Sequence, residues 1–317
     1  MNLVFFDIEC ASVHKTTAKI CAFGYVVCDE KFNIIKKEDI LINPKGGFHL
    51  TDRRGEKGLE LPYDYAEFKK HPPFPAVYSF IKELLEDKNN LVFGHAIMND
   101  VKYLDLETRR FHLPPFNFEF LDSQIMYMTH VGDFSRQFGL EYITENLNVV
   151  FTPHRAADDA YATMKIVEEL CRLHGAHPAE LAGVLGVKKG KIRDHNIVKP
   201  TSAAYERYVK ARDAAREQRS RNRTKFYIYL SRRKRKKSGR LFGQAFTFSR
   251  NIEDEVEISI PLVGRIYEEG GVYSQKLGDC TVYVCEEDDA TVRTKNARQM
   301  GQLIIINISQ LREMLND

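Results

Sequence analysis

The sequence predicts an α/β protein made of two domains with a basic helical segment between them. The chain has 317 residues, which is long for a single hydrophobic core and suits two domains. Strand-like and helix-like apolar patterns alternate near both ends, whereas the intervening segment is rich in Ala, Arg and Tyr. We therefore predict domains at residues 1–178 and 241–317, with a basic helical linker or arm at residues 179–240.

The first domain is predicted to open with strands. Residues 2–10, 20–28 and 34–42 are runs rich in Ile, Val, Phe and Tyr, which favour β-structure. Three strands before any helix indicate an antiparallel start to the sheet. Residues 91–93 form a further candidate strand, which is short and fully apolar.

Helical periodicity follows these strands. Apolar residues recur at helical spacing from Pro75 to Leu85, and proline is common in the first turn of a helix. Similar patterns predict the other helices of the first domain at residues 100–111, 122–129, 140–146 and 156–174.

The end of the chain shows a second alternation of strands and helices. Short strand candidates lie at residues 245–248, 281–285 and 303–306, and helix candidates lie at residues 261–268, 294–300 and 309–315. Strands that alternate with helices are typical of a parallel sheet. We therefore predict a small α/β module there.

The composition is typical of a soluble globular protein. The hydrophobic fraction is 43%, and no apolar stretch approaches the length of a membrane span, so no membrane partner is expected. The N-terminus has no signal-peptide pattern. None of the six cysteines has zinc-type C-x-x-C spacing, and several lie in apolar runs. A reducing, cytoplasmic setting is therefore expected.

Charge is distributed unevenly along the chain. The formal net charge is +3, but residues 204–240 contain 15 Lys or Arg and 3 Asp or Glu, a local net of +12. Six consecutive basic residues lie in this segment: Arg232, Arg233, Lys234, Arg235, Lys236 and Lys237. They are candidates for non-specific phosphate contact, which makes nucleic acid the expected partner. A solvated linker and a nuclear-import signal have the same composition, so both alternatives stay open.

Five residues in three short motifs look like a two-metal nuclease centre. Asp7 and Glu9 are two apart on the first predicted strand, so their carboxylates share a face. Asp100 begins a helix after a Gly-His turn, and His154 and Asp159 flank the start of the longest helix. Clustered carboxylates repel one another, so the pattern predicts divalent cations among them. Asp100 alone would suit an ordinary helix N-terminus, and His154 or Asp159 alone would suit a surface position; the order and spacing of all three motifs carry the prediction.

These motifs resemble those of the DEDDh branch of the DnaQ-like 3′–5′ exonucleases, over roughly residues 1–175. The resemblance implies a ribonuclease-H-like mixed sheet with flanking helices. It implies that Asp7, Glu9, Asp100 and Asp159 hold two divalent cations, Mg²⁺ or Mn²⁺, and that His154 is the general base. The expected activity is release of nucleoside 5′-monophosphates from DNA 3′ ends, in DNA repair or proofreading.

Two positions depart from this family pattern. Residues 10–12 (Cys-Ala-Ser) replace a Thr-rich sequence after the first motif, and Ala96 replaces an Asn in the second. The metal centre is unaffected, but the preference between DNA and RNA is left open. Phe48 and His49 are candidates for a wall against which the terminal base stacks. We expect His95 to pack or hydrogen-bond beneath the site.

The last domain resembles a BRCT domain. The resemblance depends on a first strand at residues 244–249, on Gly270 and Gly271 at a helix-to-strand turn, and on the order of the elements that follow. Ser249 occupies the place where phosphate-binding members use Ser or Thr, but Arg250 replaces the usual Gly. The resemblance therefore implies binding of a DNA end or a protein rather than of a phosphopeptide.

Two alternatives to a DNA exonuclease remain. One is an RNA 3′-end exoribonuclease that uses the same centre, and the other is a non-catalytic nucleic-acid-binding adaptor. Metal-dependent hydrolysis separates the enzymes from the adaptor, and competition between substrates separates DNA from RNA.

Overall fold

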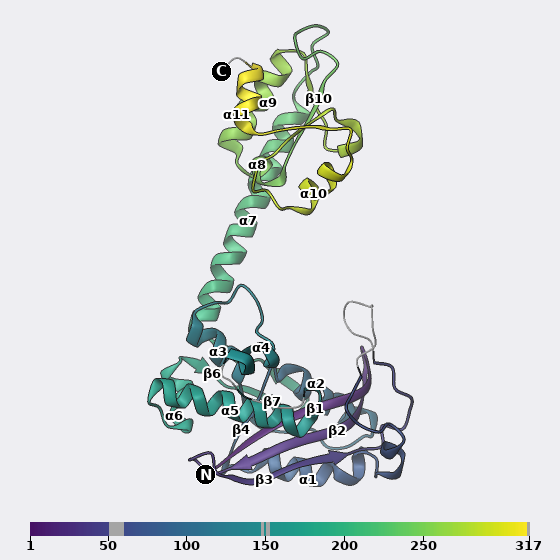
Figure 1. Ribbon diagram of the computed structural model, residues 1–317, viewed down its shortest axis with the longest axis vertical. Helices are drawn as coiled ribbons and strands as arrows, with labels where there is room; N and C mark the ends of the chain where they lie inside the picture. Colours follow the sequence, from purple (N-terminus) through teal and green to yellow (C-terminus); the bar gives the residue numbers. More distant parts are fainter. Residues whose placement is uncertain (51–59, 147–148, 150–152, 316–317) are drawn as a thin grey trace. The chain divides into compact units, whose positions relative to one another are not determined.

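The computed structural model describes residues 1–50, 60–146, 149 and 153–315 (Figure 1). The chain forms two compact units, Met1–Tyr208 and Val209–Asp317. Within the described ranges, no helix combines the length and the apolar character that crossing a membrane requires.

A seven-stranded mixed sheet forms the centre of the first unit, in the order β3-β2-β1-β4-β5-β7-β8. Its strands are β1 (Asn2–His14), β2 (Thr17–Cys28), β3 (Ile34–Leu41), β4 (Asn90–Gly94), β5 (Phe118–Asp122), β7 (Gly190–Arg193) and β8 (Asn196–Val198). The first three strands pair antiparallel, whereas β1, β4 and β5 are parallel. The predicted α/β class and the antiparallel opening are confirmed.

Helices cover both faces of this sheet (Figure 1). The helices α1 (Phe74–Glu86) and α2 (Met98–Arg110) pack on one face through residues such as Ile81, Val101 and Leu104. The opposite face is covered by α3 (Ser123–Val131), α4 (Leu140–Asn146), α5 (Ala156–His174) and α6 (Pro178–Val184). The remaining elements are the 3-10 turn η1 (Glu67–Lys70) and the short strands β6 (Val187–Lys188) and β9 (Thr201–Ser202).

Residues 179–202 differ from the predicted linker. They include most of α6 and four short strands, and two of these strands, β7 and β8, extend the large sheet beyond β5. Such strands escape sequence periodicity because they are only four and three residues long and half exposed at the sheet edge. The helix predicted for the basic segment is present as α7 (Ala203–Ser231).

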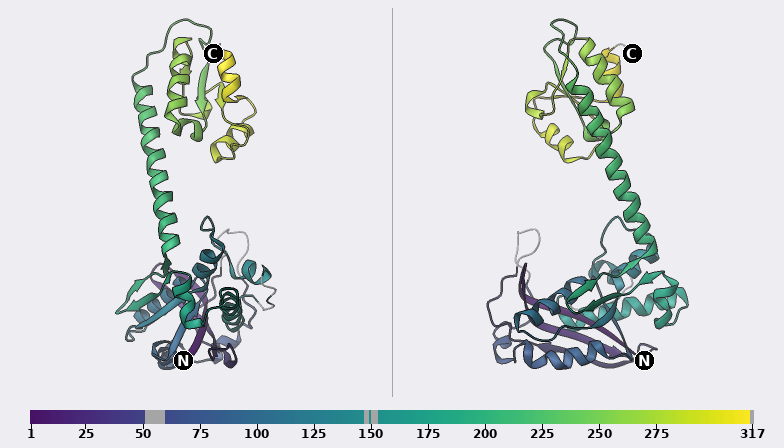
Figure 2. Two further views of the ribbon diagram at one scale, coloured as in Figure 1. Left: turned by 90° about the vertical axis from the view of Figure 1, so that its left-hand side faces the viewer. Right: turned by 180° about the vertical axis from the view of Figure 1, so that it is seen from behind.

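The second unit, coloured green to yellow in Figure 2, contains a four-stranded parallel sheet in the order β11-β10-β12-β13. Its elements are β10 (Ala245–Phe248), α8 (Arg250–Asp254), α9 (Val256–Glu268), β11 (Val272–Tyr273), η2 (Leu277–Asp279), β12 (Val282–Val284), α10 (Val292–Gln299), β13 (Ile304–Ile306) and α11 (Ile308–Leu315). Residues of α9, α11 and the end of α7 pack on one face, where Phe226 is fully buried against Phe248. Ala297 of α10 packs on the other face, against Tyr283. The predicted small α/β module with a parallel sheet is confirmed.

Candidate active site

Asp7 and Glu9 lie in β1 on the face of the sheet that α5 covers. Alternate side chains of a strand share one face, so the two carboxylates project together. Strand pairing places Gly24 of β2 opposite Asp7, and Asp39 of β3 opposite Gly24. The carboxylates of Asp7 and Asp39 therefore lie on neighbouring positions across three strands, with Gly24 between them.

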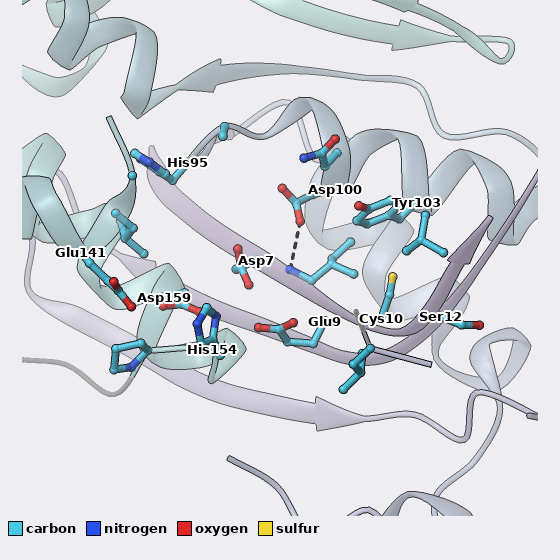
Figure 3. A pocket seen from close by; sticks show the side chains of 18 of the residues that line it. Asp7, Glu9, Cys10, Ser12, His95, Asp100, Tyr103, Glu141, His154 and Asp159 are labelled. Carbon is cyan, nitrogen blue, oxygen red and sulfur yellow. Dashed lines mark hydrogen bonds between the residues drawn. The ribbon is translucent and has the colours of Figure 1, made fainter. Parts of the chain in front are cut away.

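Asp100 comes from the first turn of α2 and is 6% exposed. Its Oδ1 accepts a hydrogen bond of 3.2 Å from the backbone N–H of Ile8, the residue between Asp7 and Glu9 (Figure 3). This hydrogen bond from the backbone of β1 thus holds the carboxylate of Asp100 beside Asp7 and Glu9.

His154 and Asp159 reach the same place from the start of α5. Asp159 lies in the first turn of this helix, and His154 lies one residue before its N-cap. The possible ligand atoms of Glu9, His154 and Asp159 all lie within 4.8 Å of one another. Figure 3 shows these side chains around the same opening as Asp7 and Asp100.

All five predicted residues line one pocket of about 680 Å³. Among the other lining residues are three with polar side chains that the sequence analysis does not identify: Asn99, Tyr103 and Glu141. Asn99 and Tyr103 lie beside Asp100 on α2, where helical spacing would have suggested them once Asp100 was placed. Glu141 comes from α4, far away in the sequence, and no local pattern points to it.

The carboxylates of this pocket perturb one another strongly. Burial, and then the charge of Asp39, raises the pKa of Asp7 to about 7. Burial and the neighbouring carboxylates raise the pKa of Glu9 to about 10 and that of Asp159 to about 9. The pKa of Asp100 is also well above its ordinary value, chiefly because of burial, although the N–H of Ile8 opposes this rise. The protein alone therefore does not balance the negative charge that these groups would carry together.

The donor set fits hard divalent cations. Carboxylate oxygens are the ligands that Mg²⁺ and Mn²⁺ prefer, and cations among the carboxylates would offset the repulsion that raises their pKa values. The close approach of Glu9, His154 and Asp159 ligand atoms, within 4.8 Å, is compatible with a shared ion. The residues present thus fit the metal centre that their motifs imply.

The first turn of α5 rests directly on β2 at Gly24. A Cβ atom added at Gly24 would lie 2.0 Å from the carbonyl carbon of Ala156 and 2.1 Å from the backbone nitrogen of Ala157, so no side chain fits there. Asp39, on the far side of this glycine, accepts hydrogen bonds from Ala157 N at 2.7 Å and from Arg155 Nε at 2.9 Å. We call this arrangement of Gly24 and Asp39 the α5 seat.

Tyr63 completes the α5 seat. Its hydroxyl accepts a hydrogen bond of 2.9 Å from Ala156 N and donates one of 3.3 Å to Asp39 Oδ1. Burial and the nearby Asp39 raise the pKa of Tyr63, so the hydroxyl keeps its proton and remains a donor. The free backbone N–H groups at the start of α5 are thereby bonded by side chains from two other segments. The position of His154 and Asp159 depends on these contacts.

His95 lines the pocket, and both of its ring nitrogens are hydrogen-bonded. Its Nε2 is 3.1 Å from the carbonyl oxygen of Phe138, which only accepts, so Nε2 carries the proton. Nδ1 then accepts from the Ser123 hydroxyl at 2.9 Å. Burial lowers the pKa of His95 to about 4, which keeps the ring neutral. The expected hydrogen bonding of His95 is confirmed, but the residue lines the pocket rather than lying under it.

Phe48 and His49, the two residues predicted to form a base-stacking wall, have different positions in the structure. Phe48 stacks on Tyr65, with ring centroids 4.3 Å apart, and contacts Phe68. It therefore packs within the protein rather than lining the pocket. His49 does line the pocket.

The basic residues 232–237 follow α7 in the second unit and are all exposed. Arg233 stacks on the ring of Tyr229 at 4.1 Å, and Arg235 stacks on Phe242 at 4.9 Å. Lys236 Nζ donates to the carbonyl oxygen of Glu268 at 2.8 Å. These contacts hold the run on the second unit with its charges in solvent.

Comparison with known families identifies the first unit. The carboxylates of this pocket are ligands of the kind that metal-dependent hydrolases use. Residues 4–167 match the family described as Exonuclease (RNase_T), and this match shows that the chain belongs to that family. The predicted exonuclease domain is confirmed, and the protein is a nuclease.

Solved structures give more distant similarities. A 3′-exonuclease studied for recognition of a histone mRNA stem-loop is 12% identical, with 64% of this chain and 71% of that chain covered and a TM-score of 0.48. A full-length 3′-exonuclease is 13% identical over 64% and 66% of the two chains, with a TM-score of 0.49. E. coli exonuclease I bound to a dT13 oligonucleotide is 17% identical over 54% and 41%, with a TM-score of 0.41. A search of curated proteins found no match.

Proposed function

We propose that the first unit is a metal-dependent 3′–5′ exonuclease that releases nucleoside 5′-monophosphates from DNA 3′ ends. The observation that carries this proposal is the convergence of four carboxylates and one histidine, from three separate elements, on one pocket. DNA repair or proofreading is the setting we propose. The mixed sheet with helices on both faces supports a ribonuclease-H-like fold.

Asp7, Glu9, Asp100 and Asp159 would hold two divalent cations, Mg²⁺ or Mn²⁺. When bound, such ions supply Lewis-acid activation of the phosphodiester and lower the pKa of a bound water. Two ions of charge +2 would neutralise four ionised carboxylates, so bound metal would balance the negative charge that the protein itself leaves unbalanced in this pocket. Asp100 is kept in position by its bond from Ile8 N.

His154 is suited to accept the proton of the attacking water. Its ring is exposed, so a proton taken up in the pocket can pass to solvent. Its ligand nitrogen lies within 4.8 Å of carboxylate oxygens of Glu9 and Asp159, close to where the water must be deprotonated. Imidazole is an effective base near neutral pH because its ordinary pKa lies there.

The residues that depart from the family pattern lie where a terminal nucleotide would bind. Cys10, Ser12 and Ala96 line the pocket together with the acidic residues. All three side chains are small, so these three positions place no bulky group against a ribose 2′-hydroxyl. An exoribonuclease therefore remains the second candidate function, and a direct comparison of substrates decides between the two.

The second unit is proposed to be a BRCT-like module spanning residues 241–317. The four-stranded parallel sheet with helices on both faces supports this. The hydroxyls of Ser249 and Thr294 are unsuited to binding a phosphopeptide, because both residues are fully buried and Thr294 is hydrogen-bonded to Tyr283 and Thr291. A DNA end or a protein remains the proposed partner, with residues 232–237 as phosphate contacts.

The test is digestion of 5′-labelled single-stranded DNA and matched RNA by the full chain, with Mg²⁺, Mn²⁺ or EDTA. We expect a metal-dependent ladder that shortens from the 3′ end, with DNA degraded faster. Asp7→Ala should abolish hydrolysis while largely sparing binding, because it removes a metal ligand and leaves the basic segment unchanged.

Asp158→Ala is the matched control. Asp158 neighbours Asp159 on α5 but forms an ion pair with Lys37 at 2.5 Å, outside the pocket lining. It should therefore leave hydrolysis near normal. Near-normal turnover by Asp7→Ala would refute the two-metal assignment. Binding of either nucleic acid without cleavage would favour the adaptor instead.

A further inference from the structure

The middle of α7 is a helical segment that buries nothing. Residues 210–221 are all exposed, whereas Phe226 is fully buried in the core of the second unit. A helix that is polar on every side gains no packing energy and depends on ion pairs along its surface. In this part of the described chain, the ion pairs are Arg212 with Asp213 and Arg221 with Glu217.

One face of this segment carries only arginines among its charged residues. We call this face the arginine stripe. Its members are spaced by four, three and four residues: Arg212, Arg216, Arg219 and Arg223. At about 100° per residue, these positions fall within about 60° of one another over about 16 Å of helix. Asp213 and Glu217 lie about 90° and about 130° round the helix from the centre of the stripe. The stripe itself therefore contains no acidic residue, although Asp213 beside it pairs with Arg212, and Glu217 pairs with Arg221 on the far side of the helix.

The C-terminal end of the arginine stripe is fixed to the second unit. Arg223 Nε and Nη2 donate to the two carboxylate oxygens of Asp254 at 2.8 and 2.6 Å. Asn222 Nδ2 donates to the backbone oxygen of Asp254 at 2.8 Å. Arg223 is thus a structural contact, while Arg212, Arg216 and Arg219 extend into solvent along the same face.

The arginine stripe destabilises the free helix. Arg212 and Arg216, and likewise Arg216 and Arg219, are like charges at spacings where helical side chains meet. Arg216 and Arg219 form no ion pair within the described ranges. A polyanion lying along the stripe would remove this repulsion.

The side-chain type in the arginine stripe indicates which kind of polyanion would bind there. All members of the stripe are Arg, whose guanidinium group binds phosphate oxygens through two parallel hydrogen bonds. On the opposite side of the helix, the exposed cations are of both kinds: Arg207, Lys210, Arg221 and Lys225. This choice of residues fits a phosphodiester backbone better than a diffuse positive charge would.

We propose that Arg212, Arg216 and Arg219 bind the phosphate backbone of the nucleic-acid substrate, at a surface separate from the carboxylate pocket and from residues 232–237. The proposal rests on the proposed function, because the substrate is the polyanion that an exonuclease must hold. The contacts are to phosphates, so binding is independent of base sequence.

The test measures binding of a long single-stranded oligonucleotide by fluorescence anisotropy across salt concentrations. All chains are full length and carry Asp7→Ala, so that the oligonucleotide survives. The stripe variant combines Arg212→Gln, Arg216→Gln and Arg219→Gln. The control variant combines Arg207→Gln, Lys210→Gln and Lys225→Gln, which remove the same charge about 150° round the helix from the stripe. Glutamine is a good helix former, and far-UV circular dichroism checks that α7 is retained.

The stripe variant should bind about tenfold or more weakly, and its salt slope should fall by about 2, because each single-strand phosphate contact contributes about 0.7. The control variant should lose less than half as much. Equal losses in the two variants would overturn the proposal, since only net charge would then matter. An unchanged affinity of the stripe variant would overturn it as well, and would leave an acidic protein as the partner of this face.

A second measurement separates this proposal from the proposed function. The stripe variant with native Asp7 is assayed on a p-nitrophenyl ester of a nucleoside 5′-monophosphate, whose single phosphate is the one that is hydrolysed. We expect the rate of the unaltered chain. If the unaltered chain cleaves neither this ester nor an oligonucleotide, the proposed function fails, whereas the binding comparison still decides the role of the stripe.

Discussion

His154 has a left-handed backbone conformation, with φ of 64°, immediately before the N-cap of α5. This conformation is uncommon for residues other than glycine, so the surroundings must stabilise it. The α5 seat fixes the backbone that follows, through bonds to the N–H groups of Ala156 and Ala157. The start of the helix therefore sets the position of the His154 ring.

His154→Ala should lower kcat by about 10²–10⁴-fold, the usual contribution of a general base. The proton acceptor is lost while the four carboxylates stay in place, so oligonucleotide affinity should change little. Measurement of the rate against pH tests the role directly. If the pH–rate profile of the variant keeps the shape of the unaltered chain, another group accepts the proton.

Asp39 is a second residue whose effect should appear in activity. Asp39→Asn keeps an oxygen for Ala157 N but removes the charge that faces Arg155. We expect a drop in kcat of about tenfold with KM nearly unchanged, because a small misplacement of catalytic groups is costly. The Mn²⁺ concentration for half-maximal rate should rise as well, since Asp159 shifts with the helix. A variant that loses thermal stability but keeps normal kcat and metal requirement would show that Asp39 is only structural.

At the scale of elements, the close packing of α5 on β2 depends on Gly24. Gly24→Ala would place a Cβ atom against the backbone of Ala156, which cannot yield as a flexible side chain would. We expect the free energy of unfolding to fall by about 1–3 kcal/mol, as for overpacked cores. Thermal denaturation of the unaltered and variant chains measures the change.

Gly183→Ala provides the control for this substitution. Gly183 lies within α6, and no atom comes within 4 Å of an added Cβ atom. Alanine is favoured over glycine in a helix, so stability should stay the same or rise by up to about 1 kcal/mol. Equal losses in the two variants would mean that the α5 seat has no special constraint.

The sequence predicts the elements that carry long apolar patterns and misses those that depend on tertiary contacts. The helices at residues 140–146 and 156–174 occur as predicted, because their periodicity extends over whole turns. The strand β5 is only five residues long, and β7 and β8 are shorter still at the edge of the sheet. For such segments, pairing with neighbours rather than local pattern determines the structure.

The same distinction applies within the candidate site. The five motif residues were found because each lies in a recognisable local context, and the structure brings them to one pocket. Asp39 could not be found this way, since it follows Lys36, Lys37 and Glu38 in a strand that looks solvated. Gly24 offered one signal, a glycine inside an apolar strand, which often marks a close approach of another backbone.

At the scale of the whole molecule, the two units should contribute separately to catalysis and binding. A chain ending at Tyr208 keeps all five motif residues and the complete seven-stranded sheet. It should cleave the p-nitrophenyl ester normally but bind long oligonucleotides more weakly, with a flatter salt slope. If its salt dependence equals that of the full chain, the basic segment is only a linker.

The exposed middle of α7 also has a consequence for proteolysis. Opening residues 211–220 locally would expose no core, so it costs little free energy, and the segment contains Arg212, Arg216 and Arg219 as trypsin cleavage sites. Brief digestion should therefore cut the chain first in α7 and leave two fragments, each retaining its own hydrophobic core. A single cleavage would release the nuclease from its accessory module without unfolding either of them.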